Sequence, residues 1–211
     1  IGQSAGSANT TGTGNVAIGA SAGAANSTGR SNTFVGYNAG LVNVVGTGNT
    51  FLGAAAGDAN TADENTFIGA GAGGANTTAI DNTFVGHLAG AATTTGGTNT
   101  FIGQGAGYTN IVGTGNTFVG MSAGYANTAD LNTFVGFRSG SANTIGNFNA
   151  FVGAYSGQSN TTGIDNTFVG YKAGVANTIG QQGVFLGYFA GSANTLGNYN
   201  VFVGSQAGKA N

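Results

Sequence analysis

The chain repeats, with small changes, the stretch Asn32-Thr33-Phe34-Val35-Gly36-Tyr37-Asn38-Ala39-Gly40. The glycine that follows each aliphatic residue recurs every 17 residues, and twice after only 16 residues. Both short intervals contain a Thr-Ala-Asp segment, at residues 61–63 and 128–130, in place of the usual Thr-x-Gly. This period is too short for repeats made of helix pairs, and it fits one coil of a solenoid.

We therefore predict an all-β fold, a parallel β-solenoid or β-roll of about 12 coils. Two strands of about four residues and two turns would fill each coil, and coils about 4.8 Å apart would give a rod roughly 58 Å long. Residues 1–211 form a single repeat array in this prediction. Because the chain begins and ends within a repeat, we expect it to be a slice of a longer fibre.

Composition narrows the function classes. Glycine occupies 43 of 211 positions without a triplet period, which excludes collagen, and the regular spacing of phenylalanine argues against a disordered linker. Ten residues carry a formal charge and the net charge is −2, so we expect no nucleic-acid partner. No apolar run is long enough for a membrane-spanning segment.

Alternation along the repeat assigns an inner and an outer face to the strand. Phe34 would point to one face, and Thr33 and Val35 to the other. We place the phenylalanines inside the coil, opposite small residues of the second half-coil. These small residues are Ala39, Val42, Ala56 and Ala59.

With phenylalanine inside, one aliphatic residue per coil faces outward. Continuous apolar surface of this kind usually marks an interface, so we expect identical chains to associate laterally, as a homotrimer around a shared axis. This aliphatic column comprises Val35, Leu52, Ile68, Val85, Ile102, Val119, Val135, Val152, Val169, Leu186 and Val203.

Two asparagines per coil also recur, one before the strand, as at Asn32, and one closing the second half-coil, as at Asn43. Asparagine suits turns because it tolerates left-handed backbone angles and bonds to its own chain. Stacked in register, the side-chain amides can also bond from coil to coil. We expect both columns to stabilise the turns.

Two known families carry similar repeats. The stretch Asn15-Val16-Ala17-Ile18-Gly19, followed by Ala22, resembles the head repeats of trimeric autotransporter adhesins. The units typified by residues 32–40 resemble the repeat arrays of bacterial and phage tail-fibre-domain proteins. The first resemblance implies parallel β-rolls assembled as trimers, and both imply a place on a cell-surface appendage or a phage tail fibre.

Catalysis needs positioned acids, bases or nucleophiles, and the sequence offers one histidine, His87, in a variable turn. We therefore expect no enzymatic activity and no cofactor. Glu64 and Asp81 occupy equivalent positions in adjacent coils and form a weak candidate pair for calcium. Since calcium takes six to eight oxygen ligands, we expect two solvated carboxylates and no metal site.

The two variable residues after the glycine become aromatic or basic toward the C-terminal half. Rings with polar tips and nearby cations suit a glycan or a receptor surface. These candidate ligand-binding residues are Phe137, Arg138, Tyr155, Tyr171, Lys172, Tyr188 and Phe189. Stacking would align Arg138, Tyr155, Lys172 and Phe189 in one column.

The sequence thus predicts a structural extracellular fibre or adhesin shaft that gives reach and rigidity and displays variable turn residues. The alternative is a solenoid that binds a ligand, either a glycan or host receptor through its turns, or ice through its threonine columns. We expect the Thr33 column to be buried beside the aliphatic column, which weakens the ice-binding alternative.

Overall fold

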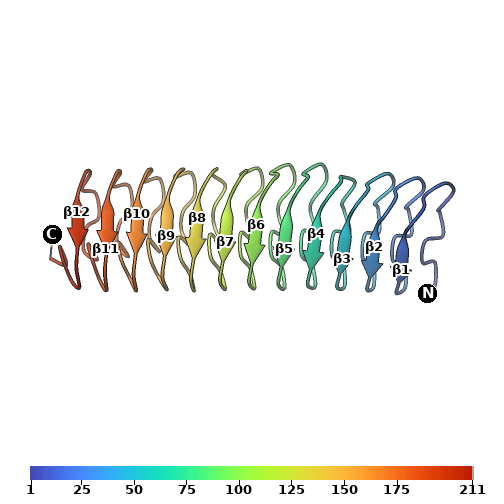
Figure 1. Ribbon diagram of the computed structural model, residues 1–211, viewed down its shortest axis with the longest axis horizontal. Coiled ribbons are helices and arrows are strands. Elements are labelled where there is room, and N and C mark those ends of the chain that lie inside the picture. Colours follow the sequence, from blue (N-terminus) through green and yellow to red (C-terminus); the bar gives the residue numbers. More distant parts are fainter. Residues whose placement is uncertain (211) are drawn as a thin grey trace.

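The computed structural model describes residues 1–210 as a single parallel β-solenoid (Figure 1). Its twelve strands form one sheet in sequence order, and each strand pairs in parallel with the next at equivalent repeat positions. The strands are β1 (Val16–Ile18), β2 (Thr33–Val35), β3 (Thr50–Leu52), β4 (Thr66–Ile68), β5 (Thr83–Val85), β6 (Thr100–Ile102), β7 (Thr117–Val119), β8 (Thr133–Val135), β9 (Ala150–Val152), β10 (Thr167–Val169), β11 (Val184–Leu186) and β12 (Val201–Val203). The predicted fold class is confirmed.

The second half of each coil differs from the prediction, because it forms successive turns instead of a second strand. Backbone hydrogen bonds still join these turns from coil to coil, as between Gly40 N and Ala56 O at 3.0 Å. The reason is local geometry. Asn38 and Gly40 both have left-handed φ angles, of 56° and 61°, which an extended strand does not allow.

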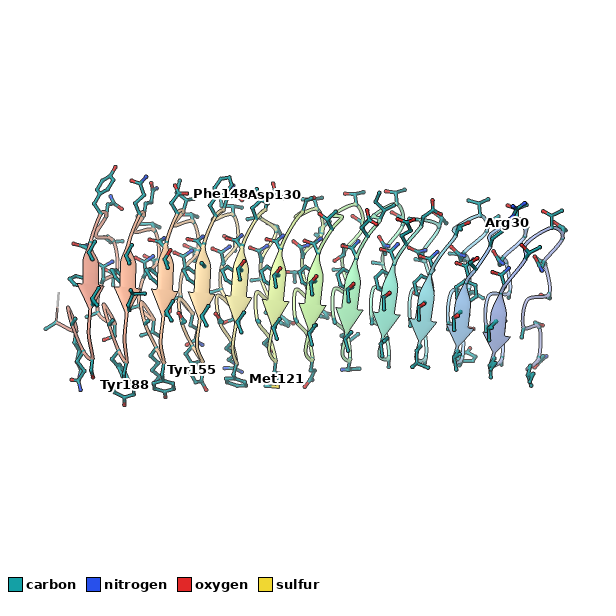
Figure 2. The ribbon with its side chains drawn as sticks, viewed as in Figure 1. Arg30, Met121, Asp130, Phe148, Tyr155 and Tyr188 are labelled. Carbon is teal, nitrogen blue, oxygen red and sulfur yellow. The ribbon has the colours of Figure 1, made fainter. Side chains whose placement is uncertain are left out.

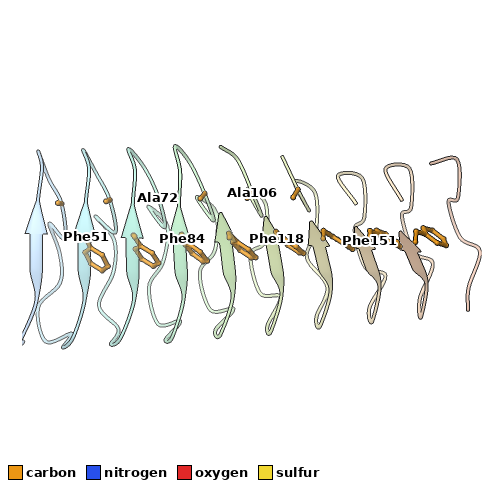
Figure 3. Packing of buried hydrophobic residues seen from close by; sticks show 14 of the residues in the cluster. Phe51, Ala72, Phe84, Ala106, Phe118 and Phe151 are labelled. Atoms are coloured by element: carbon orange, nitrogen blue, oxygen red, sulfur yellow. The ribbon is translucent and has the colours of Figure 1, made fainter. Parts of the chain in front are cut away.

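Phenylalanine fills the inside of the coils, as predicted (Figure 3). Rings from Phe51 to Phe185 stack on one another with centroids 4.4–4.9 Å apart. Ala39 and Ala56 face them and are fully buried, whereas Val42 is 39% exposed and Ala59 is only partly buried. The expectation that Val42 and Ala59 would pack against the rings was therefore wrong.

Glycine is required at two places in each coil. A Cβ on Gly124 would lie 2.5 Å from the Phe118 ring, so this position must lack a side chain for the ring to fit. A Cβ on Gly120 would lie 2.5 Å from the carbonyl oxygen of Gly136 in the next coil. These two columns allow both the ring stack and the close spacing of the coils.

Both asparagine columns are buried, and they bond between coils. Asn160 Nδ2 donates to Asn143 Oδ1 at 2.6 Å, and Asn177 Nδ2 donates to Asn160 Oδ1 at 2.8 Å. In the other column, Asn49 N donates to Asn32 Oδ1 at 2.9 Å. The predicted turn role is confirmed, and the amides also supply hydrogen bonds along the solenoid axis.

The two 16-residue coils keep the strand register. Thr50 pairs with Thr66, and Thr117 pairs with Thr133, so the missing residue is absorbed in the turn before the strand. There, Asp63 Oδ1 accepts a hydrogen bond from Thr47 N of the preceding coil at 2.7 Å. The shorter turn is thus tied down by a carboxylate.

Thr93 interrupts one asparagine column, and its buried hydroxyl has no hydrogen-bond partner within residues 1–210. Restoring the amide with Thr93→Asn would join the ladder on either side, at Asn76 and Asn110. We expect the variant to raise the free energy of unfolding by about 1 kcal/mol. Chemical denaturation measures this change.

The matched control is the reverse substitution, Asn160→Thr, in the unbroken part of the same column. It should lower stability by a similar amount. If Thr93→Asn destabilised the chain, the amide ladder would not be the source of the column's stability.

Candidate interaction surfaces

We call the outer side of the twelve-stranded sheet the strand face. It carries two columns of side chains. The first is the aliphatic column, in which Leu52 is 45% and Val169 is 38% exposed. The second is a threonine column, of which Thr33 is partly exposed rather than buried beside its neighbour, contrary to our expectation. Strand residues alternate in direction and the coil is one strand wide, so nothing in a single chain covers either column.

The turn after each strand forms one edge of the solenoid and brings the predicted ligand-binding residues together. Phe137 and Tyr155 meet edge to face with centroids 5.1 Å apart, and Tyr171 stacks on Tyr188 at 5.6 Å. Phe189 contacts Tyr188 at 4.6 Å. All these rings belong to four consecutive coils, as the repeat spacing predicts.

The cations of this cluster pack against its rings. Lys172 Nζ lies 5.7 Å from the ring centre of Tyr155, and 5.4 Å from those of Tyr171 and Phe189. Arg138 contacts the ring of its neighbour Phe137, at 5.5 Å. Cation–π attraction therefore holds these side chains along the edge.

A groove on the same edge was not predicted from the sequence. It holds about 250 Å³ and lies between His87 and Tyr125, where Gly105 supplies no side chain. Tyr108 and Tyr125 stack beside it with centroids 5.0 Å apart. The signal in the sequence was the 17-residue spacing of these two tyrosines, one coil apart.

Charge is divided between the two edges of the coil. We call the edge after the strand the basic edge, because the two positions after each strand glycine carry His87, Arg138 and Lys172 and no carboxylate. Asp58 lies farther along the turn, at the repeat position of Tyr108 and Tyr125. The edge before the strand, the acidic edge, carries Arg30 and five carboxylates, a formal charge of −4. Figure 2 shows Asp130 and Arg30 on one edge and Tyr155 and Tyr188 on the other. The five carboxylates are Asp63, Glu64, Asp81, Asp130 and Asp165.

The acidic edge also exposes large apolar side chains, which were not predicted. Ile145 is 64% and Phe148 is 56% exposed. Apolar side chains that recur along a surface indicate a site of contact with another molecule. Others on this edge are Val44, Val45, Ile80, Ile111, Val112, Leu131, Ile179, Leu196 and Tyr199.

Glu64 and Asp81 lie at equivalent turn positions of adjacent coils, both with a φ of 59°. Both side chains are exposed. Among residues 1–210, no group of three or more metal-ligating side chains gathers around them or elsewhere. The pair therefore offers too few protein ligands for a calcium site of the usual kind.

Comparison of the chain with protein-family models, curated proteins and solved structures found no match. Over the described residues 1–210, no helix long and apolar enough to cross a membrane is present.

One carboxylate, Asp58, lies outside the acidic edge, on the second half of its coil. Burial raises its pKa above the usual value, although backbone hydrogen bonds from Ala59 and Asp58 oppose the shift. Since the pKa of Asp58 is higher in the folded state, its protonation stabilises the folded chain at low pH. This contribution is lost as pH rises through the folded-state pKa.

We predict that Asp58→Asn removes this loss. Relative to the wild type, the variant should gain thermal stability as the pH rises from acid to neutral. Melting temperatures over a pH series measure the difference. Glu64→Gln, at an exposed position, is the control, and a difference for Asp58→Asn that stayed constant with pH would contradict the prediction.

Proposed function

We propose that this chain is a structural rod that associates with copies of itself, as the shaft of an extracellular fibre or adhesin. In this proposal three parallel copies bury their strand faces against a common axis. The turns then lie on the outer corners and at the contacts between neighbours.

The observation that carries the proposal is the aliphatic column, which runs outward along the whole sheet. Burial of apolar surface contributes about 25 cal/mol per Å², and the column offers one aliphatic side chain from every strand. None of the strand residues is charged, so apposing two such faces would desolvate no ion. Cyclic symmetry is the usual way in which identical soluble chains bury a shared surface.

The internal architecture supports a mechanical role. Hydrogen bonds of the backbone, the asparagine ladders and the ring stack all run along the solenoid axis. Each coil therefore contacts chiefly its two neighbours, and length can change by whole coils without altering the packing of the others. Rigidity and reach follow from this construction.

The ice-binding alternative uses the same strand face. Its support is the partly exposed threonine column, which repeats with the coil spacing beside the aliphatic column. In a rod that stayed monomeric, this flat, uncharged face would be open to solvent. The oligomeric state in solution therefore decides between the two functions.

We predict that Val135→Lys combined with Val152→Lys breaks the association. Two ammonium groups would have to be buried at the strand face, which is strongly unfavourable. Light scattering after gel filtration should give three chain masses for the wild type and one for the variant.

Val42→Lys is the control, because Val42 is as exposed as Val152 but lies on the second half of its coil. It should leave the mass unchanged. If the wild-type chain were a stable monomer, the result would contradict the fibre proposal and favour ice binding.

A further inference from the structure

Each base on the basic edge shares a strand with a carboxylate on the acidic edge. The chain passes the carboxylate, forms the strand, and reaches the base within a few residues. The three combinations are Asp81, β5 and His87; Asp130, β8 and Arg138; and Asp165, β10 and Lys172.

These residues cannot pair within one chain, because the strand separates them and they occupy opposite edges of the coil (Figure 2). Asp81, Asp165 and His87 are exposed side chains. In a single chain, therefore, the acid and the base that flank the same strand do not contact each other. Two parallel copies placed side by side would put each base opposite an acid.

The match is specific to one alignment of the copies. Carboxylates of the acidic edge precede β4, β5, β8 and β10, and bases of the basic edge follow β5, β8 and β10. Without axial stagger, all three bases face a carboxylate. Any stagger by whole coils leaves at most one such pair, and an antiparallel arrangement leaves at most two.

Aromatic residues follow the same rule at two further levels. Arg30 precedes β2 and the exposed Tyr37 follows it, which would place a cation beside a ring. Phe148 precedes β9 and Tyr155 follows it, which would bring two rings together. Glu64 is different, since Ala70 and Gly71 follow its strand β4.

We infer that the basic edge of one copy binds the acidic edge of the next, in parallel and without axial stagger. This inference rests on the proposed function, to which it adds the polarity and register of the assembly. The partner is a second copy of this chain. A contact between two different surfaces of the same chain closes into a ring when the rotation allows it, and strand faces turned toward one axis provide that rotation.

Zero-length cross-linking tests the register directly. Carbodiimide joins a carboxylate to a lysine amine only where the two touch, and the chain has two lysines, Lys172 and Lys209. We expect covalent oligomers on a denaturing gel, with Lys172 linked to Asp165 in the peptide mass spectrum. Lys172→Arg is the control: it keeps the charge and the association, but it loses this cross-link.

The association itself is measured first, by light scattering, so that two failures can be told apart. A monomer would refute the proposed function. An oligomer without the Lys172–Asp165 link, or with Lys172 linked to Asp130 or Glu64, would refute the edge pairing and leave the strand-face association intact. In an oligomer that lacked the Lys172–Asp165 link, the basic edge would be open to another acidic partner.

A charge exchange provides a second test. Asp165→Lys and Lys172→Asp should each weaken association by about two- to fivefold, since exposed ion pairs are weak, and the double variant should restore it. Glu64→Lys is the matched control. It has the same left-handed backbone position as Asp165 but no base opposite, and it should have no effect. Equal weakening by Glu64→Lys, or no rescue in the double variant, would contradict the inference.

Discussion

Every residue in this fold must pack against the equivalent residue of the next coil, and backbone hydrogen bonding fixes the distance between neighbouring strands at about 4.8 Å. Flat rings meet this condition, and the Phe84 and Phe101 rings lie 4.8 Å apart and nearly parallel. Amides meet it as well, because each is both donor and acceptor. Charges do not, since like charges would stack along the rod. This constraint explains why a chain so rich in glycine, asparagine and phenylalanine carries only ten charged residues.

The inside of the coil could be predicted from the sequence for the same reason. A column of phenylalanine rings needs space on one side of the sheet. The small alanine and glycine of each Ala-Gly pair leave that space inside the coil. The buried asparagines followed from their turn chemistry. In each case the repeat supplied many independent copies of one local pattern, so that Ala39 or Asn43 could be placed from its equivalents.

The second half of the coil could not be predicted in the same way. Its turns depend on left-handed backbone angles at the position of Asn38, Arg138 and Lys172, where many residue types occur and glycine is found in only a few coils. A pattern of small residues therefore looked like a strand. The exposed apolar side chains of the acidic edge were missed for the opposite reason, because these residues vary from coil to coil and only the structure shows which of them share a side.

The regular aliphatic column lets the strand face bind a second copy, but it does little to fix the axial register of the two copies. A column with an equivalent side chain on every strand looks nearly the same after a shift of one coil, so two such faces can slide at small cost. Irregular residues are needed to select one alignment, and the turns are where this fold tolerates them. The scattered charges of the acidic and basic edges add little free energy to the contact. The order of charged residues along these edges, unlike the aliphatic column, no longer matches after a shift by any number of coils. The charges can therefore fix how parallel copies align.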